Sequence, residues 1–227
     1  MCDAAAWQPL YPHWPEHLRY QVIDPGARDS LESMARRVLE QVPERFAIAG
    51  HSMGGRVALE VMRLAPRRVQ RLALLDTGYL PLPAGSAGAQ EVAKRQALLQ
   101  LARERSVRAM AAEWVQGMVH PARLPDRDLI DAILQMFERR TAETFAAQLQ
   151  ALIQRPDASD VLRGLYVPTL IACGREDAWS PVSQHEAMQR LAPQATLRVI
   201  EDAGHMVMME RPEETAAVLL EWLQGAA

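Results

Sequence analysis

The segment Gly50–Gly54 constrains the fold of this chain more than any other part of it. The apolar run Phe46–Ala49 before it is typical of a short buried strand, and the pattern of Met53–Leu64 after it predicts a helix that Pro66 closes. A strand that turns this sharply into a helix approaches the helix closely. We expect Gly50 and Gly54 to permit this approach, because they have no side chains that would clash. Ser52 is then expected to have a strained backbone and a hydroxyl that points out of the turn.

Strands and helices alternate on both sides of this turn. The expected order begins with a strand at Tyr20–Asp24, a helix from Leu31 to about Val42 after Asp29 and Ser30, the turn just described, and a strand at Arg71–Leu75. After residue 160 come a strand at Pro168–Cys173, a helix at about 181–191, a strand at Thr196–Ile200 and a helix at about 212–223. This alternation predicts an α/β fold, with a mostly parallel sheet and helices on both of its faces.

The alternation stops between residues 80 and 160. A linker rich in proline and glycine is followed by four helical stretches, at about 89–105, 106–119, 126–140 and 142–154. We therefore expect a core in two parts, residues 1–79 and 161–227, and an all-helical insertion at 80–160 that covers the edge of the sheet as a lid.

The composition excludes several classes of protein. A net charge of −3 gives no reason to expect a nucleic-acid partner, and the arginine clusters are diluted by nearby acids. No apolar run approaches the ~18 residues that a membrane span needs. Cys2 and Cys173 do not form a recognisable disulfide framework, so a reducing compartment is expected, and with it a cytoplasmic location.

Three polar segments follow predicted strands. Gly50–Gly54 matches the pattern G-x-S-x-G, in which the serine is a nucleophile, although a serine in such a turn can also simply cap the helix. A serine nucleophile needs a histidine base, and the base needs a carboxylate behind it. Asp177 and His205 follow predicted strands and so belong at the edge where parallel sheets place their sites; Asp76 meets the same condition and is a rival for the acid.

The three segments resemble, in the same order, those of the α/β-hydrolases, a large family of esterases, thioesterases and related enzymes with a helical cap. They are Gly50–Gly55, Gly174–Asp177 and Ala203–Met206. The resemblance implies that Ser52 is the nucleophile, Asp177 the acid and His205 the base. It favours Asp177 over Asp76 for the acid, and it makes His51 structural. The backbone N–H of Met53, at the start of a helix, is expected to stabilise the oxyanion.

The front of the chain departs from the family pattern. Members of the family usually have several strands before the one expected at Tyr20–Asp24, and the last of these ends in a turn that donates a second oxyanion amide. The residues from Met1 to Trp7 resemble those that follow this turn. We therefore expect the sequence to lack the front of the domain, including one oxyanion donor and an interior strand.

The expected reaction is hydrolysis of a small, largely apolar carboxylic ester or thioester, with no cofactor and no metal ion. Candidate pocket residues are Trp114, Trp179 and Met206, with Met110, Met118, Met136 and Phe137; for each of them alone, core packing between helices is the simpler interpretation. His120 and His185 are expected at the surface. Two alternatives remain open: another chemistry on the same scaffold, such as that of a C–C bond hydrolase, a perhydrolase or a lyase, or a non-catalytic ligand-binding or interaction protein. The sequence predicts no oligomeric state.

Overall fold

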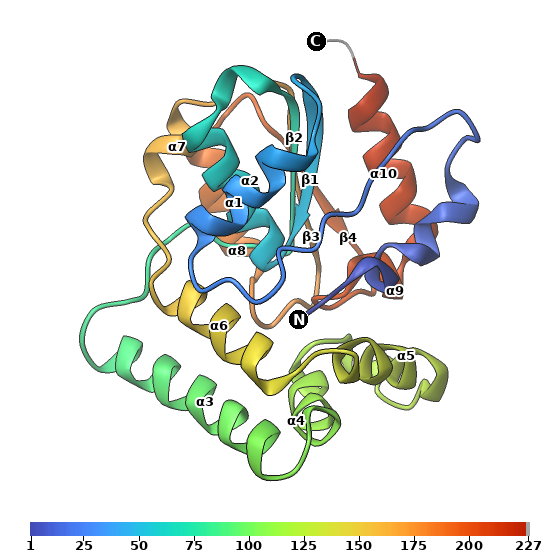
Figure 1. Cartoon of the computed structure of the whole chain (residues 1–227). Coiled ribbons are helices and arrows are strands. Elements are labelled where there is room, and N and C mark those ends of the chain that lie inside the picture. The colour runs from blue at the N-terminus through green and yellow to red at the C-terminus, as the bar shows by residue number, and fades with distance from the viewer. Residues whose placement is uncertain (226–227) are drawn as a thin grey trace.

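A computed structural model describes residues 1–225 of the chain. Its centre is a parallel sheet of four strands in the order β1-β2-β3-β4 (Figure 1). The strands are β1 (Phe46–His51), β2 (Val69–Leu75), β3 (Thr169–Gly174) and β4 (Thr196–Ile200). The apolar runs at these positions were predicted as strands, and the α/β class is confirmed.

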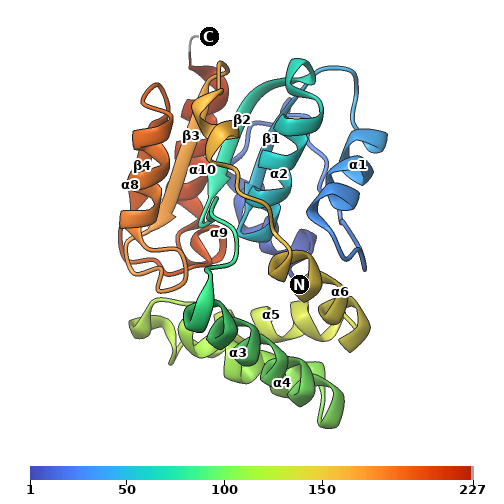
Figure 2. The ribbon, with the colours of Figure 1, turned by 90° about the vertical axis from the view of Figure 1, so that its left-hand side faces the viewer.

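Helices cover both faces of the sheet, as Figures 1 and 2 show. Side chains alternate along β2: Leu72 and Leu74 belong to the cluster on one face, and Ala73 and Leu75 to the cluster on the other. The first face packs against α1 (Leu31–Gln41), α2 (Met53–Leu64) and α8 (Val182–Leu191), and the second against α10 (Pro212–Gln224). Because both faces are covered, the buried parts of the two central strands, Leu72–Leu75 of β2 and Leu170–Cys173 of β3, are apolar.

The segment between β2 and β3 forms a helical layer at the carboxyl ends of the strands (Figure 2). Its four main helices are α3 (Gly85–Glu104), α4 (Val107–Trp114), α5 (Arg127–Glu138) and α6 (Ala142–Ile153). The side chains of Ser106, Asp126 and Thr141 cap the last three of these helices. The helix predicted at 106–119 ends earlier, at Trp114, and continues only as a 3-10 turn at Val115–Gly117.

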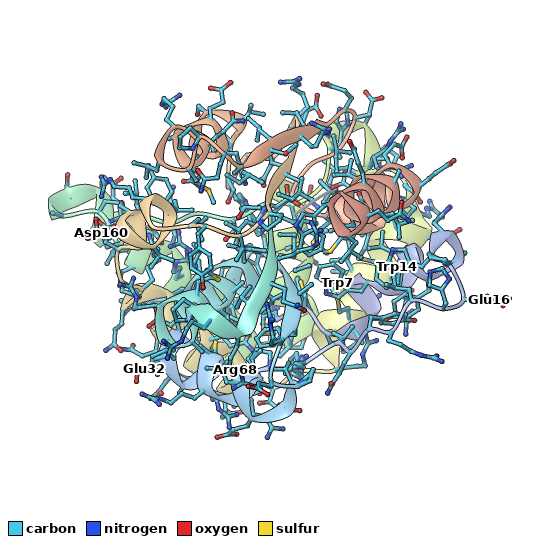
Figure 3. The ribbon with its side chains drawn as sticks, turned by 90° about the horizontal axis from the view of Figure 1, so that it is seen from above. Trp7, Trp14, Glu16, Glu32, Arg68 and Asp160 are labelled. Atoms are coloured by element: carbon cyan, nitrogen blue, oxygen red, sulfur yellow. The ribbon has the colours of Figure 1, made fainter. Side chains whose placement is uncertain are left out.

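Several short helices were not predicted. They are α7 (Ser159–Arg163), α9 (Val207–Glu210) and the 3-10 turns Ala4–Ala6, Gln8–His13, Pro66–Arg68 and Pro121–Arg123. The turn Gln8–His13, which Trp7 and Trp14 flank, packs against α10 (Figure 3), whereas Ala4–Ala6 contacts α5. Within residues 1–225, no helix combines the length and the apolar character that crossing a membrane would need.

The strand predicted at Tyr20–Asp24 is wrong. This segment runs without regular structure, and its backbone groups make no hydrogen bond within the described part of the chain. A strand exists only through a paired neighbour, and β1 pairs with β2 alone, so its other edge carries no strand among residues 1–225. Tyr20–Asp24 and β1 both line the same large cavity.

Candidate active site

The turn between β1 and α2 holds Ser52 in a strained conformation, with φ of 53° and ψ of −119°. The Ser52 N–H donates to the carbonyl oxygen of Leu75, which ties the turn to β2. A Cβ on Gly50 would lie 2.2 Å from the Gly54 carbonyl oxygen, so only glycine fits at position 50. The expectation that position 54 also requires glycine was wrong, because a Cβ there would meet nothing within 4 Å.

Three side chains that are distant in sequence lie in one hydrogen-bonded line. His205 Nε2 lies 2.8 Å from Ser52 Oγ, and His205 Nδ1 lies 2.8 Å from Asp177 Oδ2. Ser52 follows β1, Asp177 follows β3 and His205 follows β4, so each residue stands at the carboxyl end of its strand. The structure therefore brings together the three residues that the sequence singled out.

Asp177 is held as a charged carboxylate. Its Oδ1 accepts the backbone N–H groups of Trp179 and Ser180, each at 2.9 Å. Burial alone would raise the pKa of Asp177, but the charge and hydrogen bond of His205 and these two amides outweigh it and lower the pKa below its ordinary value. A buried carboxylate of this kind can orient an imidazole and stabilise its positive form.

Asp76 lies nearby but does not contact His205. Its Oδ1 accepts the Gly174 N–H at 2.9 Å, and its Oδ2 has no hydrogen-bond partner among the described residues. Burial, followed by the charge of Asp177, raises the pKa of Asp76 well above its ordinary value. The geometry thus separates the two rivals, since Asp177 and not Asp76 stands behind the His205 ring.

His51 supports the loop that carries His205. Its ring is buried, and Nε2 lies 2.6 Å from the backbone carbonyl oxygen of His205. Burial, followed by the nearby His205 ring, lowers the pKa of His51 to about 3. The neutral ring therefore donates its one N–H to that carbonyl, as expected for a structural histidine.

Glu210 supports the site, although no motif in the sequence predicted a role for it. Its carboxylate is almost fully buried at the end of α9 and accepts backbone N–H groups from His120 at 2.7 Å, Gly204 at 3.0 Å and Met206 at 3.1 Å. The residues on either side of His205 are thus anchored to one carboxylate. A glutamate that ends the apolar run Met206–Met209 was the available signal, because an acid in such a run is rarely buried without partners.

The N–H of Met53 is the first amide of α2 and makes no hydrogen bond with any described residue. It follows Ser52 directly, at the positive end of the helix, where unpaired amides favour a negatively charged oxygen. Within residues 1–225, we identify no second backbone N–H beside Ser52 that could donate to the same negatively charged oxygen.

A cavity of about 1360 Å³ opens over these residues and extends along the free edge of β1. The predicted pocket residues that line it are Trp114, Met118, Phe137, Trp179 and Met206. Trp179 lies between Trp114 and the imidazole, with ring centroids 5.2 Å from Trp114 and 4.9 Å from His205. Met110 and Met136 are fully buried and are not among the lining residues, so for these two the alternative of core packing holds.

The remaining histidines are not part of the site. His185 was expected at the surface but is fully buried, and its Nε2 accepts the Thr77 N–H at 3.1 Å. His120 is half-buried. His13 and His17 are exposed, and the described residues hold no group of three or more side chains suited to a metal ion.

The fold and the site define the class of this protein: an α/β protein with a helical insertion, whose polar centre lies on a tight strand-to-helix turn. The chain belongs to the α/β-hydrolase family, whose sequence model matches residues 7–218. It is 30% identical to the pimeloyl-[acyl-carrier protein] methyl ester esterase of Methylococcus capsulatus, over 97% of this chain and 90% of that one.

Two further proteins are similar to nearly the whole of this chain. The dihydrolipoyllysine-residue acetyltransferase component of the acetoin cleaving system of Pseudomonas putida is 30% identical over 98% of this chain, which spans only 60% of the relative's length. A malate-bound structure of a thermophilic esterase from Thermogutta terrifontis superimposes with a TM-score of 0.85 at 27% identity, covering 98% of this chain and 86% of the other.

Proposed function

We propose that this protein is a serine hydrolase that cleaves a small carboxylic ester or thioester through an acyl-enzyme on Ser52. The observation that carries the proposal is the hydrogen-bonded line from Ser52 Oγ through the His205 ring to Asp177 Oδ2, with both distances 2.8 Å. Relatives named as esterases support the same class of reaction.

In the proposed reaction, Ser52 Oγ attacks the carbonyl carbon while His205 Nε2 takes the hydroxyl proton. Asp177 keeps the other ring proton on Nδ1 and stabilises the imidazolium. The Met53 N–H donates to the oxyanion at the end of the α2 dipole. His205 then protonates the leaving alcohol or thiol, and a water molecule activated by the same ring releases the acid from Ser52.

The apolar side of the cavity is proposed to hold the acyl chain. Trp114 comes from the helical insertion, Trp179 follows Asp177, and Met206 follows His205, so the three line the cavity close to the reacting atoms. Residues 80–160 then act as a lid over the sheet. An acyl chain that fills this side of the cavity would displace water from it and strengthen the polar interactions beside it.

A fluorophosphonate probe tests the nucleophile directly. The wild-type protein is expected to be labelled, and Ser52→Ala is not. Ser33→Ala is a matched control, because Ser33 lies on α1 outside the cavity, and it should be labelled like the wild type. Labelling of Ser52→Ala at the wild-type rate, or no labelling of a folded wild-type protein, contradicts the proposal.

One observation favours a non-catalytic alternative. Only the Met53 amide is identified as an oxyanion donor within residues 1–225, and loss of one such donor from an enzyme costs about 3–4 kcal/mol of transition-state stabilisation. On this alternative the cavity binds a ligand without turning it over. A folded protein that resists the probe but binds small carboxylic esters would support it.

A further inference from the structure

One wall of the cavity carries an excess of positive charge that the proposed reaction does not use. Its four cations are Arg56 on α2, Lys94 and Arg95 on α3, and Arg155 after α6. We call this set the cationic wall. Both the core and the helical insertion contribute to it, so the charges meet where the two parts face each other.

A single carboxylate, that of Glu91, pairs with the cationic wall. Arg155 binds both of its oxygens, at 2.8 and 2.9 Å, and Arg95 binds Oε1 as well, at 2.8 and 3.0 Å. Asp3 and Asp24, which also line the cavity, are paired with Arg139 and Arg140 instead. One negative charge therefore faces four positive ones.

Arg56 is the member of the cationic wall whose side-chain N–H groups most clearly lack acceptors. Its Nη1 donates to the Leu80 carbonyl oxygen at 2.9 Å, an acceptor that Arg155 Nε shares at 3.2 Å. Nε and Nη2 of Arg56 have no acceptor among residues 1–225, and Arg56 forms no salt bridge there. Burial, followed by the charge of Arg155, lowers the pKa of Arg56 to about 9, so the site disfavours this cation as it stands.

The free Nε and Nη2 atoms form a fork that matches a carboxylate. Arg139 uses the same two nitrogens to bind the carboxylate of Asp3, at 2.8 and 3.0 Å. Such side-on pairs are stronger and more specific than single hydrogen bonds. Arg56 thus offers two hydrogen-bond donors suited to a carboxylate, and no described residue supplies that carboxylate.

Arg56 also lies close to the proposed nucleophile. Its backbone N–H donates to the Ser52 carbonyl oxygen at 3.4 Å, one helical turn away, and both residues line the same cavity. A small molecule in the cavity can therefore contact both.

We infer that the substrate is a half-ester of a dicarboxylic acid, whose free carboxylate binds Arg56 while its ester carbonyl lies at Ser52. The inference rests on the proposed function and names the substrate class for it. The carboxylate supplies the missing acceptor and offsets the charge of the cationic wall, while the chain between the two ends lies along the apolar side of the cavity.

Paired substrates test the inference. Monomethyl succinate, glutarate and adipate are compared with methyl butanoate, pentanoate and hexanoate, in which a methyl group replaces the distal carboxylate. The best half-ester should have a kcat/KM at least about tenfold above its neutral partner. Arg56→Gln should remove this advantage, chiefly by raising KM about 10- to 100-fold, and should leave the neutral ester within about twofold.

Arg63→Gln is the matched control on the same helix. Arg63 pairs with Glu60 outside the cavity, so this variant should retain the preference for half-esters. Because Arg56→Gln could destabilise the fold, the wild type provides a second measurement. Raising the salt concentration to about 0.5 M should lower kcat/KM for the half-ester and not for the neutral ester.

Ligand binding separates failure of this inference from failure of the proposed function. In the Ser52→Ala background, adipate should raise the melting temperature, and adding Arg56→Gln should abolish the rise. If no ester is cleaved and no probe reacts but this pattern holds, the hydrolase proposal fails and the carboxylate site stands. Equal rates on paired esters, with no effect of Arg56→Gln, overturn the site alone. Stabilisation by inorganic phosphate and not by adipate overturns the carboxylate assignment.

Discussion

The carbonyl oxygen of Gly54 lies 2.2 Å from the point where a Cβ on Gly50 would stand. Strand β1 and helix α2 thus pass each other with no room for one methyl group. The three atoms nearest to that point belong to the backbone of Gly54 and Gly55, which cannot move aside as the end of a side chain can. The strained position of Ser52 depends on this close approach.

Gly50→Ala is therefore expected to destabilise the protein by about 3 kcal/mol or more, since overpacking against fixed atoms is costly. For a chain of this size that corresponds to a fall in melting temperature of about 6–12 °C. Gly54→Ala is the control: its Cβ meets nothing, and alanine favours a helix over glycine by up to about 1 kcal/mol. Equal melting temperatures for the two variants would refute the close approach.

Substitutions of the two neighbouring aspartates, Asp177 and Asp76, should lower the activity of the protein to very different extents. Asp177→Asn keeps the size of the side chain but removes the charge behind His205 and is expected to lower kcat by about 10³- to 10⁴-fold. Asp76→Asn should lower it by less than about tenfold, because Asp76 does not contact the ring and asparagine can still accept the Gly174 N–H. Steady-state kinetics on one ester decide this, and a greater loss for Asp76→Asn would reverse the assignment of the acid.

Asp76 should also shape the dependence of stability on pH. The raised pKa of Asp76 means that the folded protein keeps a proton which the unfolded chain releases near pH ~3.9. This contribution to stability is fully present below that pH and is lost as the pH rises through the folded-state pKa. Asp76→Asn does not titrate, so its melting temperature relative to the wild type should rise as the pH increases from about 4 through the folded-state pKa of Asp76. A difference that is flat or falls with pH would contradict the raised pKa.

Glu210→Gln tests the anchor of the His205 loop. The amide offers one acceptor oxygen in place of two, so at least one of the three buried N–H groups loses its partner, at a cost of about 1–3 kcal/mol. Displacement of the loop should also lower kcat by up to about 100-fold, since catalysis is sensitive to shifts of ~1 Å. Glu221→Gln, on an exposed part of α10, is the control and should match the wild type in both melting temperature and kcat.

Much of the fold could be predicted because its strands have recognisable local sequence patterns. The runs that form β1 and β3 are short and apolar, the run that forms β4 is short and mostly apolar, and glycine, proline or polar residues bound them. The Tyr20–Asp24 segment has the same local pattern, yet it is not a strand, because strand formation also requires a paired neighbour. Local sequence cannot show whether that neighbour is present.

The three central residues of the candidate site could be predicted from the sequence, but the residues that hold them in place could not. Ser52, Asp177 and His205 each follow a recognisable strand, so their meeting follows from the topology of a parallel sheet. Glu210 and His185 act through contacts with segments 90 and 108 residues away in the sequence, and no local pattern encodes those contacts. The same holds for Arg56, whose position on an ordinary helix gives no sign that its fork lacks an acceptor.

The hydrogen bond between Ser52 and His205 spans 153 residues of sequence. On the proposed function, Ser52 is synthesised 153 residues before its base, which arrives only with the loop after β4. Contacts of such long sequence separation form slowly, because the intervening chain must first be brought to order. On the proposed function, a nascent or half-folded chain is inert, and the first turnover marks the moment at which the carboxyl-terminal segment has docked.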